Sequence, residues 1–188
     1  MIELVRKSFA FEARSDGQAQ GIVRGYASTY QKDAYGDRIA PGAFGESIKE
    51  KRGRYPVLWG HDPGALIGFT TKAAEDHKGL DVEALLALGN STGRDAYELV
   101  KTAEAAGSTM GLSIGFITRQ WEMDDDVRTL TDVDLIEISL TAFPANRGAR
   151  IEEARSRSGI HATALLALQN EIRAARLRVA LESLKGGM

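Results

Sequence analysis

The most informative absence in this chain of 188 residues is cysteine, which does not occur at all. Without cysteine the chain has no disulfide framework, no thiol nucleophile and no thiolate ligand for a metal. Histidine is almost as scarce, because only His61, His77 and His161 occur, and their spacing matches no zinc motif. We therefore expect no metal and no cofactor.

Long apolar stretches are missing as well. No segment reaches the roughly 18 apolar residues that a membrane-spanning helix needs, and the first residues lack the apolar core of a signal peptide. The net charge of −2 favours no particular partner. We therefore expect neither a membrane nor a nucleic acid among the partners of this protein.

What the sequence does contain is a series of short segments in which apolar and polar residues alternate. This alternation is typical of β-strands, and strands that follow one another without regular helices favour antiparallel pairing. One segment instead repeats apolar residues at helical spacing. We expect an α+β protein, mainly β, with a mostly antiparallel sheet or barrel of about seven strands. The expected strands are 2–12, 21–29, 55–59, 66–73, 79–88, 109–119 and 134–142, and the expected helices are 41–51 and 91–107.

The composition changes after the predicted globular domain, residues 1–149. Residues 150–160 are rich in arginine, serine and glutamate, which predicts a linker, and residues 161–188 predict a helical, basic tail. Residues 147–188 carry a net charge of +4 and the rest of the chain −6. The basic charge is either that of a solvated helix surface or that of a separable tail that meets an acidic surface. The apolar face of the tail either packs on its own domain or binds a partner. Its short heptad seam consists of Leu165, Leu168, Ile172, Ala175 and Val179.

Ser113 is a candidate nucleophile. It lies between Gly111 and Gly115 in a predicted strand, where its side chain points away from Leu112 and Ile114, which should face the core. The flanking glycines allow a close approach by another backbone, which suits a bound substrate. No helix follows directly, so the nucleophile elbow of the α/β-hydrolases is excluded. The alternative is an ordinary structural serine.

His61 and Glu137 are the residues best suited to assist such a serine. His61 is expected at the end of a strand, where it could act as a base or simply bond a nearby carbonyl. Glu137 stands between isoleucines in a predicted strand, and a carboxylate there needs a partner. It either orients the imidazole or forms an ion pair with Arg119 or Arg128.

Two aspartates compete with Glu137 for the role of the orienting carboxylate. Asp132 and Asp134 lie at the edge of the same predicted strand. We expect both to face solvent, which makes Glu137 the better candidate.

An ordered set of short motifs resembles the prohead proteases of tailed bacteriophages. Each motif is weak by itself, whereas the set is specific and extends over residues 20 to 147. The motifs are Gly25-Tyr26-Ala27-Ser28, Asp37-Arg38-Ile39-Ala40-Pro41-Gly42-Ala43-Phe44, Leu58-Trp59-Gly60-His61-Asp62, Ile67-Gly68, Lys78-Gly79-Leu80, Gly111-Leu112-Ser113-Ile114-Gly115-Phe116, Leu135-Ile136-Glu137-Ile138-Ser139-Leu140 and Phe143-Pro144-Ala145-Asn146.

The resemblance implies the fold of the herpesvirus maturation proteases, a small β-barrel with peripheral helices. It also implies a catalytic order of histidine, serine and third member, which His61, Ser113 and Glu137 follow. The herpesvirus enzymes use a second histidine as the third member, and this chain departs from them because Glu137 would take that role. Backbone N–H groups near Asn146 and Arg147 are implied as the oxyanion hole.

The function that the resemblance implies is a serine endopeptidase of procapsid maturation. It would cleave scaffold protein or the scaffolding arm of the major capsid protein, and also itself, inside the procapsid in the bacterial host cytoplasm. The linker would be the self-cleavage region and the tail a targeting or propeptide segment. Herpesvirus relatives dimerise, so a homodimer is a further expectation. The alternatives are a catalytically inactive capsid- or scaffold-associated protein of the same fold, and an unrelated β-rich binding module.

Overall fold

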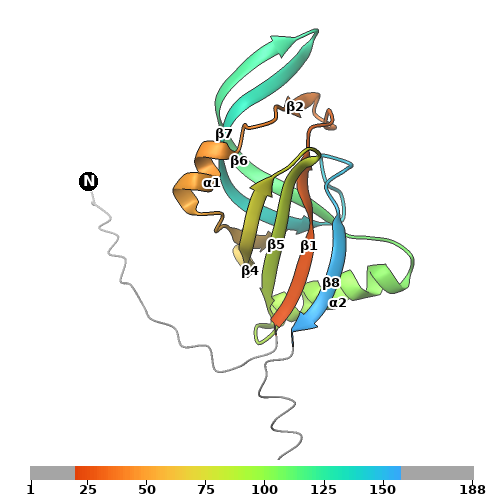
Figure 1. Cartoon of the computed structure of the whole chain (residues 1–188). Helices are drawn as coiled ribbons and strands as arrows, with labels where there is room; N and C mark the ends of the chain where they lie inside the picture. The colour runs from red at the N-terminus through yellow and green to blue at the C-terminus, as the bar shows by residue number, and fades with distance from the viewer. Residues whose placement is uncertain (1–19, 158–188) are drawn as a thin grey trace, which may run out of the picture. The chain divides into compact units, whose positions relative to one another are not determined.

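The computed structural model describes residues 20–157, which belong to one compact unit (Figure 1). The strand expected at 2–12 and the tail expected at 161–188 lie outside the described residues. None of the helices within 20–157 has the length and apolar character needed to cross a membrane. The elements are β1 Gln20–Thr29, β2 Asp37–Ile39, α1 Gly45–Lys51, β3 Pro56–Trp59, β4 Asp62–Glu75, β5 Gly79–Ala87, α2 Ser91–Ala105, β6 Gly111–Asp124, β7 Val127–Thr141 and β8 Ile151–Arg157.

All eight strands of the described region join one mixed sheet in the order β2-β7-β3-β4-β5-β1-β8, with β6 paired to β7. The pairs β1–β5, β1–β8, β3–β4, β4–β5 and β6–β7 are antiparallel. The short strands β2 and β3 run parallel to β7 and pair with its two ends. The mainly β expectation is therefore confirmed, with a parallel component that alternation along the sequence does not reveal.

The expected barrel is wrong, because the sheet is open. Within the described residues, β6 meets the β8 end of the sheet only around the isolated bridge between Gly111 and Arg150. Beyond that point β6 pairs with β7 in a long hairpin whose outer end projects from the body, and β6 no longer pairs with β8 (Figure 1). The hairpin turns at Asp125 and Asp126, both of which have positive φ, as two-residue hairpin turns require.

Strand β8 occupies part of the segment for which the sequence predicts a linker. Ile151–Arg157 pairs antiparallel with β1 and lies at an edge of the sheet. Ile151 is buried, whereas Glu152 and Arg155 are exposed. Edge strands carry charged side chains on their exposed face, which is why the composition of this strand resembles that of a linker.

The core lies between the inward-facing residues of the strands and the two helices. Burying each large aliphatic side chain contributes about 1.5–3 kcal/mol. Helix α2 buries Ala96, Tyr97 and Val100 and is capped by the side chain of Asn90, which accepts the Thr92 N–H at 2.8 Å. The largest side chains with less than 2% exposure are Phe44, Tyr55, Val57, Ile67, Leu80, Val82, Leu86, Leu130, Val133, Leu135, Ile138 and Leu140.

Candidate active site

His61 lies in the two-residue turn that joins β3 to β4. Gly60 and His61 both have positive φ, 61° and 65°, as tight hairpin turns require. Such a conformation costs a non-glycine residue about 1–2 kcal/mol, so the turn needs anchoring. The Gly60 N–H donates to the Leu140 carbonyl at 3.0 Å, and the His61 N–H donates to Ser139 Oγ at 2.9 Å. Strand β7 thereby holds the turn in place, and the expected strand-end position of His61 is confirmed.

Glu137 is the partner of the His61 imidazole. Its Oε1 lies 2.6 Å from His61 Nδ1, and its Oε2 accepts the Ser139 hydroxyl at 2.9 Å. The Glu137 side chain is only 10% exposed, whereas the His61 side chain is 45% exposed. A short contact at low exposure fixes the ring orientation and leaves Nε2 as the nitrogen available for chemistry.

The alternative partners proposed for Glu137 are engaged elsewhere. Arg119 donates to Glu50 at 3.0 Å, and Arg128 pairs with Asp37 through its Nε at 2.9 Å. Neither arginine contacts Glu137 in the described part of the chain.

The competing carboxylate Asp134 is likewise occupied, and it is less exposed than the sequence suggests. Its side chain is 25% exposed and forms an ion pair with Lys51. The hydrogen bond from Lys51 holds the pKa of the Asp134 carboxyl below its ordinary value. Asp132 is partly exposed. Neither aspartate is within contact of His61 in the part of the chain that the structure describes.

Ser113 faces the same side of the sheet as Glu137. In the β6–β7 register Ser113 lies opposite Ser139, and Gly115 lies opposite Glu137. Residues opposite one another and two apart share a face of the sheet, whereas Leu112, which is 3% exposed, points to the core. The predicted face of Ser113 is therefore confirmed.

The glycines beside Ser113 make room for this chain and not for a substrate backbone. A Cβ on Gly111 would lie 2.5 Å from the Pro144 ring, and a Cβ on Gly115 would lie 2.3 Å from Glu137 Oε1. Both distances are far below van der Waals contact. The expectation of a substrate at these positions is wrong, because the loop after β7 and the Glu137 carboxylate fill the space.

A β-bulge in β7 lies between Glu137, which faces the site, and Leu135, which faces the core. The register shifts between Gly115 and Phe116, so that Ile136 is the extra residue, and Ile136 is 42% exposed. Leu135, the next paired residue, is fully buried. Bulges re-aim side chains in this way near sites. Because of the bulge, Glu137 in one cross-strand pair faces the site, and Leu135 in the next pair is buried in the core.

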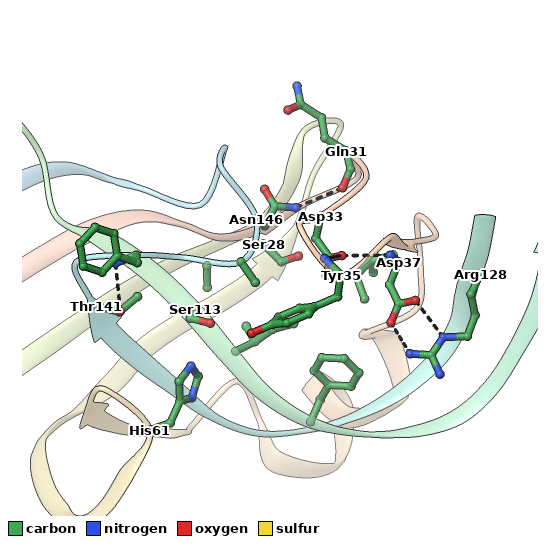
Figure 2. Close-up of a pocket in the computed structure, with 16 residues that line it drawn as sticks. Ser28, Gln31, Asp33, Tyr35, Asp37, His61, Ser113, Arg128, Thr141 and Asn146 are labelled. Carbon is green, nitrogen blue, oxygen red and sulfur yellow. Dashed lines mark hydrogen bonds and ion pairs between the residues drawn. The ribbon is translucent and has the colours of Figure 1, made fainter. Parts of the chain in front are cut away.

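Ser113 and His61 open into one pocket of about 530 Å³ (Figure 2). Two aromatic residues on its wall, Tyr35 and Phe143, are 85% and 92% exposed. The described residues contain no hydrogen bond between Ser113 and His61; such bonds often tighten only when substrate binds. The other lining residues are Ala27, Ser28, Gln31, Asp33, Asp37, Ile39, Ile114, Phe116, Arg128, Thr141, Ala145 and Asn146.

The loop after β7 borders the pocket and is anchored by Asn146. Its amide donates to the carbonyls of Thr29 at 2.9 Å and Gln31 at 3.2 Å, and its Oδ1 accepts the Gly148 N–H at 3.0 Å. Both amide hydrogens are therefore used within the protein. Asn146 lines the pocket, whereas Arg147 is exposed and does not. Within residues 20–157, no group of three or more histidine, aspartate or glutamate side chains is arranged to hold a metal.

Residues 9–163 match the family described as Caudovirus prohead serine protease. The chain belongs to this family. Sequence relatives agree with the match. The prohead protease of Enterobacteria phage HK97 is 34% identical over 150 residues, which are 77% of this chain and 64% of that protein. The prohead protease of Escherichia phage T5 is 28% identical over 146 residues, which are 74% of this chain and 67% of that protein. The chain thus spans slightly less than two thirds of its HK97 relative.

A further relative is a larger protein, of which only one region matches this chain. The chain is 28% identical over 153 residues to the capsid polyprotein of Pseudomonas phage PAJU2, of which the matched region is 22%. Among solved structures, that of KSHV protease with a hexapeptide phosphonate inhibitor superposes with a TM-score of 0.46 at 14% identity, covering 74% of this chain and 65% of that one.

Sequence reasoning missed Ser139, which binds both the His61 turn and the Glu137 carboxylate. A signal was available, because a residue two positions after Glu137 on a strand lies on the same face. Its reach to His61 was not readable, since this depends on the parallel pairing of β3 with β7.

Proposed function

We propose that this prohead protease family member is a serine endopeptidase in which Ser113 is the nucleophile, His61 the base and Glu137 the residue that orients the imidazole. The observation that carries the proposal is the 2.6 Å contact between His61 Nδ1 and Glu137 Oε1 beside a pocket that Ser113 also lines. A carboxylate bound to one ring nitrogen fixes the tautomer in which the other nitrogen accepts a proton.

The chemistry then follows acyl transfer. His61 Nε2 takes the Ser113 proton while Oγ attacks the scissile carbonyl, and the imidazolium returns that proton to the leaving amine. Water attacks the resulting acyl-enzyme with His61 again as base. Glu137 stays ionised throughout and stabilises the charged ring.

We propose the backbone N–H groups of Asn146 and Arg147 as the oxyanion hole. Neither group donates a hydrogen bond to any other part of residues 20–157, and Asn146 lines the pocket. The side-chain amide of Asn146 is unsuited to this role, because both its hydrogens are bound to Thr29 and Gln31. Main-chain donors held by an anchored loop suit a developing oxyanion.

We propose capsid and scaffold proteins as the substrates, and the interior of the procapsid in the host cytoplasm as the place of action. The family description and the prohead proteases of phages HK97 and T5 support this assignment. The similarity to a region of a capsid polyprotein is consistent with it. The homodimer expected from the sequence stays a prediction, which analytical ultracentrifugation checks.

We also propose self-cleavage between residues 150 and 160, with residues 161–188 as the segment released. Pairing of β8 with β1 constrains this step, because a protease binds its substrate in an extended and accessible form. Cleavage within β8 requires the strand to leave the sheet first. Intact masses of the wild type and of Ser113→Ala after long incubation test the step, and equal masses would contradict it.

A serine-directed phosphonate probe tests the activity. The wild type and the exposed-serine control Ser91→Ala should both be labelled, whereas Ser113→Ala and His61→Ala should not. Labelling that persists in Ser113→Ala would refute the assignment of the nucleophile. An unlabelled wild type that still binds capsid protein would instead favour the catalytically inactive relative.

The substrate class is tested with a major capsid protein and a scaffold protein from the same phage. Wild-type protein should shorten one of them, and Ser113→Ala should leave both intact. Labelling by the probe without cleavage of either protein would overturn the substrate class while leaving the serine chemistry in place.

A further inference from the structure

Ser139 forms hydrogen bonds with both the backbone of His61 and the carboxylate of Glu137, and no other residue of the described region does so. It lies on β7 with no exposed surface, opposite Ser113 of β6 and beside Leu58 of β3. Its hydroxyl donates to Glu137 Oε2 and accepts the His61 N–H, both at 2.9 Å. One hydroxyl therefore uses its hydrogen on the carboxylate and a lone pair on the backbone of the histidine.

The bond from His61 to Ser139 acts on a backbone conformation that needs support. His61 has a φ of 65°, which histidine adopts only when surrounding structure holds it there. The neighbouring bond from the Gly60 N–H to the Leu140 carbonyl would restrain the turn without Ser139. It does not restrain the His61 peptide itself. The Ser139 hydroxyl is what sets the direction from which the imidazole leaves the backbone.

The hydrogen bond from Ser139 to Glu137 acts on the carboxylate that contacts the His61 imidazole. Glu137 has two oxygens and a side chain that is 10% exposed. Oε1 is committed to His61, and in the described residues Oε2 has only the Ser139 hydroxyl as a side-chain donor. Without that donor a nearly buried carboxylate oxygen would lose its partner and turn toward water, moving Oε1 with it.

We propose that Ser139 is a positioning residue for the reaction of Ser113, fixing the imidazole of His61 and the carboxylate of Glu137 in one mutual geometry. This inference rests on the proposed function. Ser139 does not touch the reacting atoms, because it is fully buried and does not line the pocket. It acts through two residues at once, and so its loss should slow the chemical step without weakening substrate binding.

Steady-state kinetics of Ser139→Ala tests the proposal, with Ser47→Ala as a matched control. Ser47 is also fully buried and also accepts a backbone N–H, that of Leu135 on β7 at 3.0 Å, but it lies outside the pocket. We expect kcat of Ser139→Ala to fall about 100-fold at unchanged KM, as for a reacting group displaced by about an ångström. Ser47→Ala should lose stability and keep its kcat. Wild-type kcat in folded Ser139→Ala would overturn the proposal.

A pair of substitutions with the same shape isolates the hydroxyl. Ser139→Thr and Ser139→Val differ only by that group, so any overpacking of the buried site is common to both. We expect Thr to be far more active than Val. Equal activity of the two would refute the positioning role, and this comparison remains decisive if Ser139→Ala does not fold.

A spectroscopic readout separates positioning from general stability. The His61 Nδ1–H, held by Glu137, gives a downfield proton resonance whose position reports that hydrogen bond. It should move in Ser139→Val and stay in place in Ser139→Thr and Ser47→Ala; an unmoved resonance in Ser139→Val contradicts the proposal. The two proposals fail in different ways. If cleavage by the wild type does not depend on Ser113, the proposed function is refuted. If Ser139→Val is as active as the wild type, only the positioning role of Ser139 is refuted.

Discussion

The Glu137 carboxylate occupies the place where a side chain on Gly115 would be. The two residues are paired across β6 and β7, and a Cβ on Gly115 would lie 2.3 Å from Glu137 Oε1. Strand β6 thus contributes Ser113 and, two residues later on the same face, the space through which Glu137 reaches His61. The glycine is as much a part of the site as the side chains.

Gly115→Ala should impair catalysis although it adds only one methyl group. The methyl displaces the Glu137 carboxylate, and a shift of about an ångström in an orienting group lowers kcat about 100-fold. Cleavage assays on folded protein check this. Gly45→Ala is the matched control, because a Cβ there meets nothing within 4 Å. Full activity of Gly115→Ala would show that the carboxylate position is unimportant.

Glu137→Gln should lower kcat by about 10⁴-fold, because a neutral amide neither holds the productive tautomer nor stabilises the imidazolium. The fold should persist, since the two side chains have nearly the same shape, and thermal melting checks this. Glu50→Gln removes an exposed carboxylate that pairs with Arg119 and should leave kcat unchanged. Comparable rates for the two variants would remove Glu137 from the mechanism.

Asn146→Ala should lower both stability and activity. It removes the bonds that tie the loop after β7 to Thr29 and Gln31, and leaving such groups without partners costs about 1–3 kcal/mol. Urea unfolding measures the loss of stability. Asn90→Ala removes the cap of α2, which costs about 1 kcal/mol, and should keep kcat. If Asn146→Ala is destabilised but keeps its full kcat, this loop does not form the oxyanion hole.

Stability should fall between pH 4 and pH 2 because of the Asp76 carboxyl. The hydrogen bond from the Tyr26 hydroxyl, at 2.6 Å, lowers the Asp76 pKa from its ordinary value of 3.8 to about 2. A lowered pKa stabilises the fold above the unfolded-state value and loses that effect as pH falls through the folded-state value.

Tyr26→Phe should therefore be less stable at pH 7 and show a shallower loss of stability between pH 4 and pH 2. Urea unfolding across this range measures both effects. Tyr35→Phe, at an exposed tyrosine, should behave like the wild type. An unchanged pH dependence in Tyr26→Phe would show that this hydrogen bond does not set the Asp76 pKa.

Much of the element pattern was predictable, because it depends on local periodicity. The strands around Val23, Ile67 and Val82 and the helix around Tyr97 alternate or repeat clearly, and each forms close to where it was expected. Strand β6 was predicted too short, because its outer residues 120–124 are all exposed and show no alternation of buried and exposed positions. Trp121, for example, is 54% exposed there.

Residue types made Ser113, His61 and Glu137 candidates for catalysis, each with a structural alternative. The resemblance to the prohead proteases then implied that the three serve one reaction in the order His61, Ser113, Glu137. The contact of His61 with Glu137 agrees with that prediction. The role of Gly111 and Gly115 could not be predicted from the sequence, because the groups that fill the space beside them come from other segments of the chain.

The sequence by itself determined most of the strands and which side chains can do acid–base and nucleophilic chemistry, because both depend on neighbouring residues and on residue type. Only the tertiary structure decided that the sheet stays open, that Ile151–Arg157 joins β1, and that Ser139 binds both Glu137 and His61. These features depend on which strands pair and in which register. Pairing between residues far apart in the chain is set by the packing of the whole molecule.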